Sequence, residues 1–343
     1  MRILTVDNLQ IRKWGAPKVA TDRKLVNGYV RNNFRTLEFS DRDVAAMEAP
    51  LGLRDLGRRA ANRRLIETAR NWQPDMVQLG HCDIIRNETL AEIRKAVPGV
   101  RIAFRNVDPL FDPANVSKID ARADHVDAIF ITTGGEKLRR FKRAGNVVSF
   151  IPNPCDPAIE DMDNSARPAD AFERDLVFCG VGNPTDPRYP LVKRLHDALD
   201  GAMRFTSFGM HGPGAVWGLA YDKVLAGSKM ALNLNRTEGD YLYSSARMSQ
   251  LMGNGLLTFM DAACGYRKFF GDGEAAFFGS EDELVAKIRQ FHADDAKRRA
   301  VAGAGRRFYQ THFSGEMVGR FIVETTMGTA YSRNYLWADE VIR

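Results

Sequence analysis

KMALNLNRTEGDYLYSSARMSQLMGNGLLTFMD, residues 229–261, is the stretch that most clearly predicts the fold. Met230–Leu234 and Leu256–Met260 are apolar runs with the length of buried strands. Between them, a polar loop leads to Ser244 and Ser245, which stand where the N-cap of a helix is expected, and a Gly-Asn-Gly turn ends that helix. The order strand, loop, short helix, turn, strand is typical of a parallel βαβ unit.

The start of the predicted helix has the features of a phosphate site. The first turn of a helix leaves N–H groups free and carries the positive end of the dipole, and here two serine hydroxyls and Arg247 are added. Arg247, Gln250 and Asn254 are spaced i, i+3, i+7 and share one face. We therefore expect this helix to hold a phosphate or a diphosphate.

The segment resembles the donor-sugar domain of GT-B glycosyltransferases, and in particular the bacterial group-1, spore-maturation-like type. In that family an apolar strand ending in Asn is followed by a loop, by Ser-x-Arg-x-x-Glu on a helix and by a turn of small residues. Ser245, Arg247 and the Gly253–Gly255 turn match this pattern. The family's Glu, which usually holds the ribose hydroxyls of the nucleotide, falls on Gln250, which forms hydrogen bonds but carries no charge. The resemblance extends from about Asp175 to the mid-320s.

Length and alternation predict two domains. A chain of 343 residues is too long for one ordinary core, and strand-like and helix-like segments alternate in both halves. In the first half, for example, we expect a strand at 76–79 and helices at 117–123 and 136–143. Residues 164–171, NSARPADA, are polar and hold a proline, so they form the predicted linker. The resemblance implies an α/β protein of GT-B architecture, with two Rossmann-like βαβ domains facing a central cleft. We expect an acceptor domain at 1–160, a nucleotide-sugar donor domain at 172–312, and C-terminal helices at 313–343 that pack back toward the N-terminal domain. The alternation is also compatible with other two-domain α/β proteins.

The composition favours a cytoplasmic protein. No run of about 20 apolar residues is present, and the N-terminus enters a strand-like pattern without the apolar segment of a signal peptide. The net charge is +6, and much of it lies in two basic runs, at 58–64 and 137–143. Three interpretations are open: a solvated helix face, peripheral contact with the anionic inner face of the membrane, and nucleic acid. No nucleic-acid motif is present, so we do not expect a nucleic-acid partner.

Candidate donor-site residues follow the strands of the second half. In open parallel sheets, ligands bind beyond the carboxyl ends of the strands. Glycines there let backbone N–H groups approach phosphate oxygens, and a guanidinium matches the oxygens of a leaving diphosphate. Arg236 is a candidate for this role, and in the alternative interpretation it only forms a salt bridge within the loop, with Glu238 or Asp240. The acid-rich piece at 238–240 has no metal-ligand spacing, so we expect no metal and no cofactor beyond the nucleotide-sugar. The predicted donor-binding residues are Gly180, Gly182, Asn183, His211, Asn233, Arg236, Tyr243, Ser244, Ser245, Arg247 and Gln250.

The first half offers candidates for the general base and for acceptor binding. Asp7, His81 and Asp108 each follow a predicted strand, and in an inverting reaction one of them could deprotonate an acceptor hydroxyl, whereas a retaining reaction needs no such base. Asp7 could equally cap the loop that follows it. Asp108 is preferred because its strand end is central, while a turn aspartate and a structural histidine remain the alternatives. Lys13, Trp14 and Lys18 lie in a polar loop after the first predicted strand. An aromatic face beside cations suits sugars or anionic glycolipids, and the simpler alternative is a loop that only faces solvent. The predicted acceptor-binding residues are Asp7, Lys13, Trp14 and Lys18.

These features and the resemblance predict an enzyme, a hexosyltransferase-like glycosyltransferase. It would move a sugar from a nucleotide-sugar to a glycan, lipid-linked or protein acceptor in bacterial surface polysaccharide or glycoconjugate synthesis. A non-catalytic nucleotide-sugar-binding protein and a nucleotide-sugar epimerase of the same fold are the alternatives. A nicotinamide-dependent dehydrogenase is disfavoured, because no GxGxxG follows the first strand.

Overall fold

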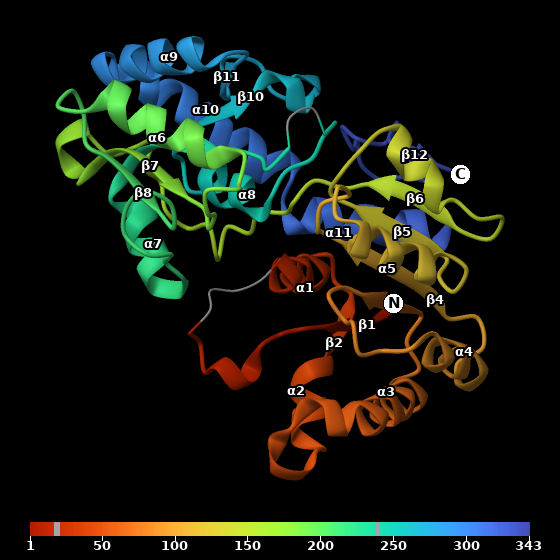
Figure 1. The fold of residues 1–343 in the computed structure, drawn as a ribbon. Helices are drawn as coiled ribbons and strands as arrows, with labels where there is room; N and C mark the ends of the chain where they lie inside the picture. The colour runs from red at the N-terminus through yellow and green to blue at the C-terminus, as the bar shows by residue number, and fades with distance from the viewer. Residues whose placement is uncertain (17–20, 238–239) are drawn as a thin grey trace. The chain divides into compact units, whose positions relative to one another are not determined.

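The chain divides into two compact units (Figure 1). The computed structural model describes every residue except 17–20 and 238–239. Unit 1 comprises Met1–Pro154 and Gly315–Arg343, and unit 2 comprises Cys155–Ser314. The chain therefore leaves unit 1 once and returns to it for the last helix.

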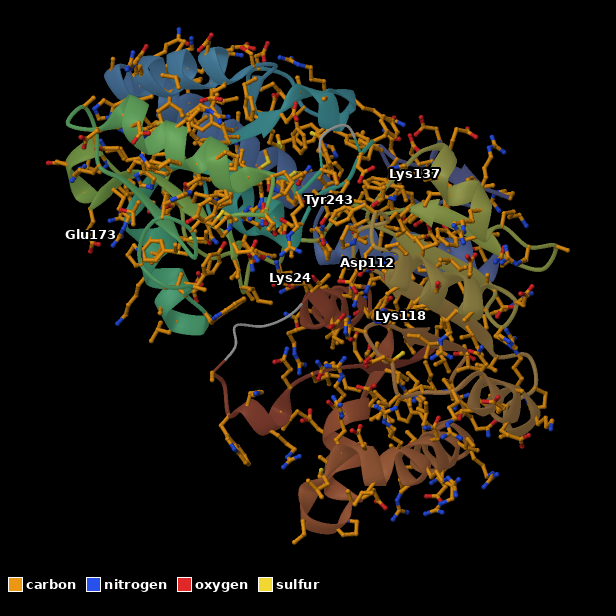
Figure 2. All side chains as sticks on the ribbon, viewed as in Figure 1. Lys24, Asp112, Lys118, Lys137, Glu173 and Tyr243 are labelled. Carbon is orange, nitrogen blue, oxygen red and sulfur yellow. The ribbon has the colours of Figure 1, made fainter. Side chains whose placement is uncertain are left out.

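Unit 1 is built on a sheet that has seven strands in the described part of the chain, in the order β12-β6-β5-β4-β3-β1-β2. All pairings are parallel except that of β12 with β6. The central strands are runs of buried Ile, Val, Leu and Phe, as expected where helices cover both faces of a parallel sheet. Figure 2 draws the side chains of the described residues on the ribbon. The strands are β1 Arg2–Asp7, β2 Arg35–Ser40, β3 Met76–Leu79, β4 Arg101–Asn106, β5 Ala128–Ile131, β6 Val147–Phe150 and β12 Val341–Ile342. The helices are α1 Thr21–Arg31, α2 Asp41–Met47, α3 Arg58–Trp72, α4 Asn87–Ala96, α5 Pro113–Ala123 and α11 Gly315–Met327, with 3₁₀ turns η1 Ile11–Lys13, η2 Pro50–Gly52, η3 Arg54–Gly57 and η4 Glu136–Phe141.

The C-terminal segment returns to unit 1 through close contact between α1 and α11. A Cβ added at Gly28 would overlap the carbonyl oxygen of Gly315, so the two backbones touch where neither helix carries a side chain. Arg320 extends this contact, since its guanidinium lies 4.9 Å from the centre of the Phe34 ring and its Nε donates to Asn32 Oδ1 at 3.0 Å. This is the predicted packing of the C-terminal segment back onto the N-terminal domain.

Unit 2 is built on a parallel sheet with the order β11-β10-β9-β7-β8, five strands within the residues described. The strands are β7 Arg174–Cys179, β8 Phe205–Phe208, β9 Ser228–Asn233, β10 Leu257–Asp261 and β11 Ala276–Phe278. The helices are α6 Arg188–Leu199, α7 Gly218–Ala226, α8 Ala246–Gly253, α9 Glu281–Ala293 and α10 Asp295–His312, with 3₁₀ turns η5 Ala169–Ala171, η6 Ala262–Cys264 and η7 Tyr266–Lys268. None of the helices in the described residues is long and apolar enough to cross a bilayer.

The units divide at Pro154 and Cys155, ahead of the predicted linker at 164–171. That segment is polar because some of its side chains form hydrogen bonds within unit 2. The side-chain amide of Asn164, for example, is buried and donates to the carbonyl oxygens of Leu225 at 2.7 Å and Ser228 at 2.9 Å. Composition alone does not distinguish such a segment from a solvated connection.

Candidate functional site

In unit 2 the strand order reverses between β7 and β9. These strands are neighbours in the sheet, while β8 lies beyond β7 on one side and β10 lies beyond β9 on the other. Consecutive crossovers therefore leave this point in opposite directions, and open α/β sheets bind ligands at the carboxyl ends of the strands at such a reversal. The polar segment that follows β9 leads into α8, so the predicted phosphate helix is connected directly to the reversal point.

Arg247 on α8 bridges the carboxyl ends of the two strands. Its Nη1 donates to the carbonyl oxygen of Cys179 at 2.9 Å, and its Nη2 donates to that of Leu234 at 2.5 Å. The guanidinium also lies 5.1 Å from the centre of the Phe178 ring. Burial lowers the pKa of Arg247 to about 10, and the nearby charge of Arg188 acts in the same direction. Arg247 is therefore a cation at neutral pH, and its two Nη groups hold the carboxyl ends of β7 and β9 together.

Buried polar atoms that lack a hydrogen-bond partner among the described residues gather on the segment from β9 to α8. They are Asn233 Oδ1, Asn235 Oδ1, Ser245 Oγ and Arg247 Nε. Ser245 is the N-cap residue of α8, with φ −80° and ψ 162°, yet its hydroxyl makes no capping hydrogen bond. An unsatisfied buried polar group costs about 1–3 kcal/mol, so a cluster of them calls for an explanation such as an ordered water or a ligand.

Two glycine-rich loops after β7 and β8 pack tightly against each other. Gly209 has φ +86°, and a Cβ there would lie only 2.8 Å from the carbonyl oxygen of Gly180. A Cβ at Gly182 would overlap the terminal methyl of Met210. The structure therefore requires small residues in these loops for packing, and their approach to a phosphate stays a prediction.

Asn183 and His211 are engaged with their own surroundings. The side-chain oxygen of Asn183 accepts from the backbone N–H of Thr185 at 2.9 Å and from its hydroxyl at 2.6 Å. The His211 ring lies 3.7 Å from the Tyr189 ring, and its Nε2 is 2.7 Å from the carbonyl oxygen of that tyrosine. These two predicted donor-binding side chains shape the loops, and a role in binding stays a prediction.

Arg236 is the more accessible cation at this edge of the sheet, with 54% of its side chain exposed. Its Nε lies 3.8 Å from Asp186 Oδ2, a carboxylate that Arg188 already holds at 2.8 Å. Glu238, one alternative partner considered from the sequence, lies outside the described residues. Across the described ranges, no group of three or more His, Cys, Asp and Glu side chains is arranged to hold a metal ion.

The remaining predicted donor-site residues build the entry to α8. Gln250 accepts a hydrogen bond from the Tyr221 hydroxyl at 3.2 Å. Ser244 is fully buried, and its hydroxyl accepts from a buried tyrosine at 2.9 Å. The carbonyl oxygen of Tyr243 accepts from the side-chain amide of Asn235 at 3.0 Å. These contacts fix the loop ahead of the helix, while the Ser245 hydroxyl has no partner in the described residues.

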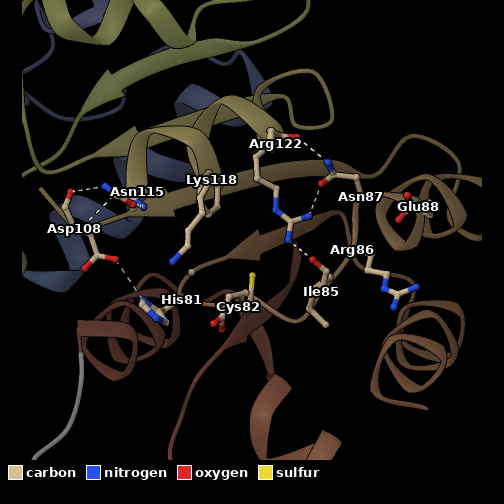
Figure 3. Close-up of a pocket in the computed structure, with 15 residues that line it drawn as sticks. His81, Cys82, Ile85, Arg86, Asn87, Glu88, Asp108, Asn115, Lys118 and Arg122 are labelled. Atoms are coloured by element: carbon tan, nitrogen blue, oxygen red, sulfur yellow. Dashed lines mark hydrogen bonds and ion pairs between the residues drawn. The ribbon is translucent and has the colours of Figure 1, made fainter. Parts of the chain in front are cut away.

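Unit 1 contains a cavity of about 530 Å³ beyond the carboxyl ends of β3 and β4 (Figure 3). Two of the candidate bases line it together: His81 Nδ1 lies 3.8 Å from Asp108 Oδ2, and their side chains are 44% and 43% exposed. Lys118 points into the same space in Figure 3, and its ammonium has no partner in the described part of the chain. The lining also includes Gly80, Cys82, Asp83, Ile85, Arg86, Asn87, Glu88, Phe104, Asn106, Asn115, Ala121 and Arg122.

Asp7 positions His81 and does not line the cavity. Its side chain is buried, Oδ1 accepts from the backbone N–H groups of Asn8 and His81 at 2.8 Å, and Oδ2 accepts from Arg105 at 2.9 Å. Burial raises the pKa of Asp7, while the charge of Arg105 opposes that rise. Asp7 was predicted to bind the acceptor directly, but its oxygens are used inside the protein and it lies behind the candidate base.

Asparagine side chains fix the loop that carries Asp108. Asn106 Oδ1 accepts from the backbone N–H of Asp108 at 3.1 Å, and Asn115 Nδ2 donates to the Asp108 carbonyl oxygen at 3.0 Å. The two asparagines also bond to each other at 2.7 Å. Both candidate bases are therefore held through their backbones while their side chains stay accessible.

The sequence analysis assigned no functional residue to α5, the helix that lines the cavity together with His81. Asn115, Lys118 and Arg122 lie on α5, and the helix was predicted to begin only at residue 117. Their i, i+3, i+7 spacing places them on one face, a signal that was available. Of the predicted acceptor-binding residues, Lys13 and Trp14 are exposed and do not line the cavity, and Lys18 lies outside the described residues.

The comparisons with known proteins agree with this geometry. Residues 188–323 match the family model described as "Glycosyl transferase-like". HepE from Anabaena, solved in complex with UDP and glucose, is 14% identical with a TM-score of 0.58, and the match covers 96% of this chain and 100% of HepE. Sucrose-phosphate synthase from Thermosynechococcus elongatus is 11% identical with a TM-score of 0.64, covering 96% and 99%. AviGT4, a glycosyltransferase involved in avilamycin A biosynthesis, is 13% identical with a TM-score of 0.57, covering all of both chains. No curated protein sequence matches.

At these identities the similarity of the solved structures is one of fold, and the spore-maturation-like subtype stays a prediction. The strand order of each unit, the return of the last helix and the full-length structural matches point to one architecture. The chain has the GT-B fold of these solved structures, and its residues 188–323 match the glycosyl transferase-like family model.

Proposed function

We propose that this protein is a glycosyltransferase that binds a nucleotide-sugar donor at the reversal point of unit 2. The observation that carries the proposal is a set of buried polar atoms on the β9–α8 segment that have no hydrogen-bond partner among the described residues, including Ser245 Oγ and Arg247 Nε. The HepE structures hold UDP with glucose and UDP-glucose, which makes UDP the first nucleotide to test here.

The donor-site residues fit the charge that develops during glycosyl transfer. As the bond between the sugar C1 and the phosphate oxygen breaks, negative charge builds on the leaving nucleoside diphosphate. Preorganised donors aimed at that charge lower the barrier. The Ser245 hydroxyl, the free N–H groups of α8 and Arg247 Nε supply fixed donors, while Arg236 supplies an accessible cation. Gln250 would hold the ribose with neutral hydrogen bonds.

We further propose that the cavity of unit 1 receives the acceptor hydroxyl. In an inverting reaction the proton of that hydroxyl passes to a base beside it. His81 and Asp108 stand together at the cavity, so one takes the proton and the other stabilises the charge that results. Lys118 would hold an oxygen-rich part of the acceptor. This arrangement suits a glycan, a lipid-linked sugar or a protein side chain, in a cytoplasmic step of bacterial glycoconjugate synthesis.

Calorimetry with UDP and GDP, followed by turnover of the matching UDP- or GDP-sugars, tests the proposal. We expect micromolar binding of one nucleotide and slow donor hydrolysis, because water reaches the site when no acceptor is present. His81→Gln and Asp108→Asn should each reduce turnover by about 10²–10⁴-fold while the nucleotide still binds with wild-type affinity.

Three results would separate this proposal from its alternatives. Nucleotide binding without hydrolysis or transfer over a broad panel of donors and acceptors would indicate a binding protein. An epimerised donor formed without any acceptor would indicate an epimerase. A complete lack of nucleotide binding would remove the donor site itself.

A further inference from the structure

Unit 1 exposes a group of large apolar side chains on two adjacent segments, defined here as the apolar patch. One segment is the loop containing η1, and the other connects α2 to α3 through η2 and η3 (Figure 1). Soluble proteins expose single apolar residues freely, but gathered ones mark a contact surface. The members and their exposures are Ile11 60%, Trp14 88%, Met47 79%, Leu51 95%, Leu53 54% and Leu56 64%.

Hydrogen bonds tie the two segments into one surface. The backbone N–H groups of Ile11 and Arg12 donate to the two carboxylate oxygens of Asp43 on α2, at 2.8 and 3.2 Å. Arg12 Nη1 also lies 3.4 Å from the carbonyl oxygen of Gly52 in η2. The two segments that carry the exposed apolar side chains are therefore held together.

Two bulky residues of the patch have left-handed backbone conformations, with φ 52° at Trp14 and φ 56° at Leu51. Trp14 is the C-cap of η1, where its backbone N–H donates to the carbonyl oxygen of Ile11. Both side chains are almost fully exposed. Residues in such sparsely populated conformations gather at functional sites.

Uncompensated cations adjoin the patch. Lys13 lies next to Trp14, and Arg59 and Arg63 are exposed at an i, i+4 spacing on the first turns of α3, immediately after Leu56. Within the residues that the structure describes, these three side chains form no ion pair or hydrogen bond. They are available for an anionic partner.

The second basic run is different. Arg139 pairs with Glu136 at 2.5 Å, Arg140 pairs with Asp120 at 2.6 Å, and Arg143 lies 3.4 Å from that same aspartate. Run 137–143 is therefore largely a compensated surface, whereas Lys13, Arg59 and Arg63 beside the apolar patch have no ion-pair partner among the described residues.

We propose that the apolar patch inserts into the headgroup region of an anionic phospholipid bilayer, with Lys13, Arg59 and Arg63 held against the lipid phosphates. Charge complementarity selects this partner. A neutral protein surface would cover the leucines but leave the cations unpaired, whereas an anionic bilayer takes both. An exposed tryptophan between apolar and basic side chains is also typical of membrane interfaces. The proposal concerns unit 1 alone and does not depend on the glycosyltransferase activity.

Co-sedimentation with vesicles tests it, using phosphatidylcholine alone and a 7:3 mixture of phosphatidylcholine and phosphatidylglycerol. We expect binding to the mixture and much weaker binding to phosphatidylcholine. The Leu51→Ser/Trp14→Ser variant should lose about tenfold or more in partitioning at any ionic strength. Arg59→Gln/Arg63→Gln should lose about tenfold in low salt and little in high salt, because screening already removes that part of the attraction.

Matched controls come from exposed apolar residues outside the patch. Trp217→Ser removes a 69% exposed tryptophan of unit 2, and Val30→Ser removes a 57% exposed valine of α1. Both should bind vesicles like the wild type, and thermal unfolding confirms that each variant is folded. Binding that ignores vesicle charge, or that the Leu51→Ser/Trp14→Ser variant retains, would overturn the proposal. So would sedimentation velocity showing a dimer that this variant abolishes while the wild type ignores vesicles, since a second copy would then be the occupant.

Discussion

Replacing Ser245 by alanine should separate ligand binding from folding. The Ser245 hydroxyl is buried, makes no capping hydrogen bond and has no partner in the described structure. Its removal deletes no hydrogen bond among the described residues and relieves an unsatisfied group that costs about 1–3 kcal/mol. The free energy of unfolding of Ser245→Ala should therefore be unchanged or raised by up to that amount.

Binding of the nucleotide should change in the opposite direction. A hydrogen bond from a hydroxyl to a charged phosphate contributes about 1.5–3 kcal/mol. Since about 1.4 kcal/mol corresponds to a factor of ten, the dissociation constant for UDP should rise roughly 10- to 150-fold. Calorimetry measures the binding constant, and denaturant unfolding without nucleotide measures the stability.

Ser249 on the same helix provides the matched control. It is fully buried, but its hydroxyl donates to the carbonyl oxygen of Ala246 at 2.9 Å. Ser249→Ala should lose about 0.5–1.5 kcal/mol of that hydrogen bond, partly returned by the higher helix propensity of alanine, and should bind UDP normally. If Ser245→Ala binds UDP like the wild type, or loses stability more than Ser249→Ala does, the assignment of Ser245 to the donor site is refuted.

Three further predictions concern stability. Arg247→Met should lower the free energy of unfolding by about 2–5 kcal/mol in a denaturant titration, because two buried strand-end carbonyls lose their donor; a change below about 1 kcal/mol would contradict the bridging role. Burial raises the pKa of Asp41 from 3.8 to about 7, so between about pH 4 and 7 the native state binds more protons than the unfolded state. Stability should therefore fall as pH rises through that window, by up to about 1.4 kcal/mol per pH unit, and Asp41→Asn should flatten the profile measured by chemical denaturation; a variant with the wild-type slope would show that another group is responsible. Gly28→Ala should cost about 3 kcal/mol or more by forcing α1 away from Gly315, while Gly145→Ala, where a Cβ meets no atom within 4 Å, should be nearly neutral in the same titration; equal effects would argue against the close helix contact.

The sequence predicted a helix or strand correctly where adjacent residues alone specify that element. The strand at 76–79 was predicted and observed with the same bounds, because four residues with an apolar majority are bounded by Pro74 and Gly80. The start of α8 at Ser245 was likewise predicted, since an N-cap depends on adjacent residues. The alternation of such elements, together with the family resemblance of the second half, was enough to identify the GT-B fold.

The sequence did not predict elements and boundaries that depend on contacts with residues far away in the chain. The short helix α2 and the two-residue strand β12 were not predicted, and residues 136–143 were expected to form an α-helix but give the 3₁₀ turn η4. These elements are too short to carry a periodic signal, and their neighbours in space stabilise them. The unit boundary was misplaced for the same reason, because the partners of Asn164 lie about sixty residues further along the chain.

By itself, the sequence determined which residues carry charge, hydroxyl groups and helix starts, and so which chemistry the chain can perform. Only the tertiary structure decided which of those groups remain available. The Nη groups of Arg247 bridge two strands, and both oxygens of Asp7 hold a loop and an arginine. The Ser245 hydroxyl and the Lys118 ammonium, in contrast, have no partner within the part of the chain that the structure describes. Hydrogen bonds and burial are relations between residues far apart in the chain, and no local pattern encodes them.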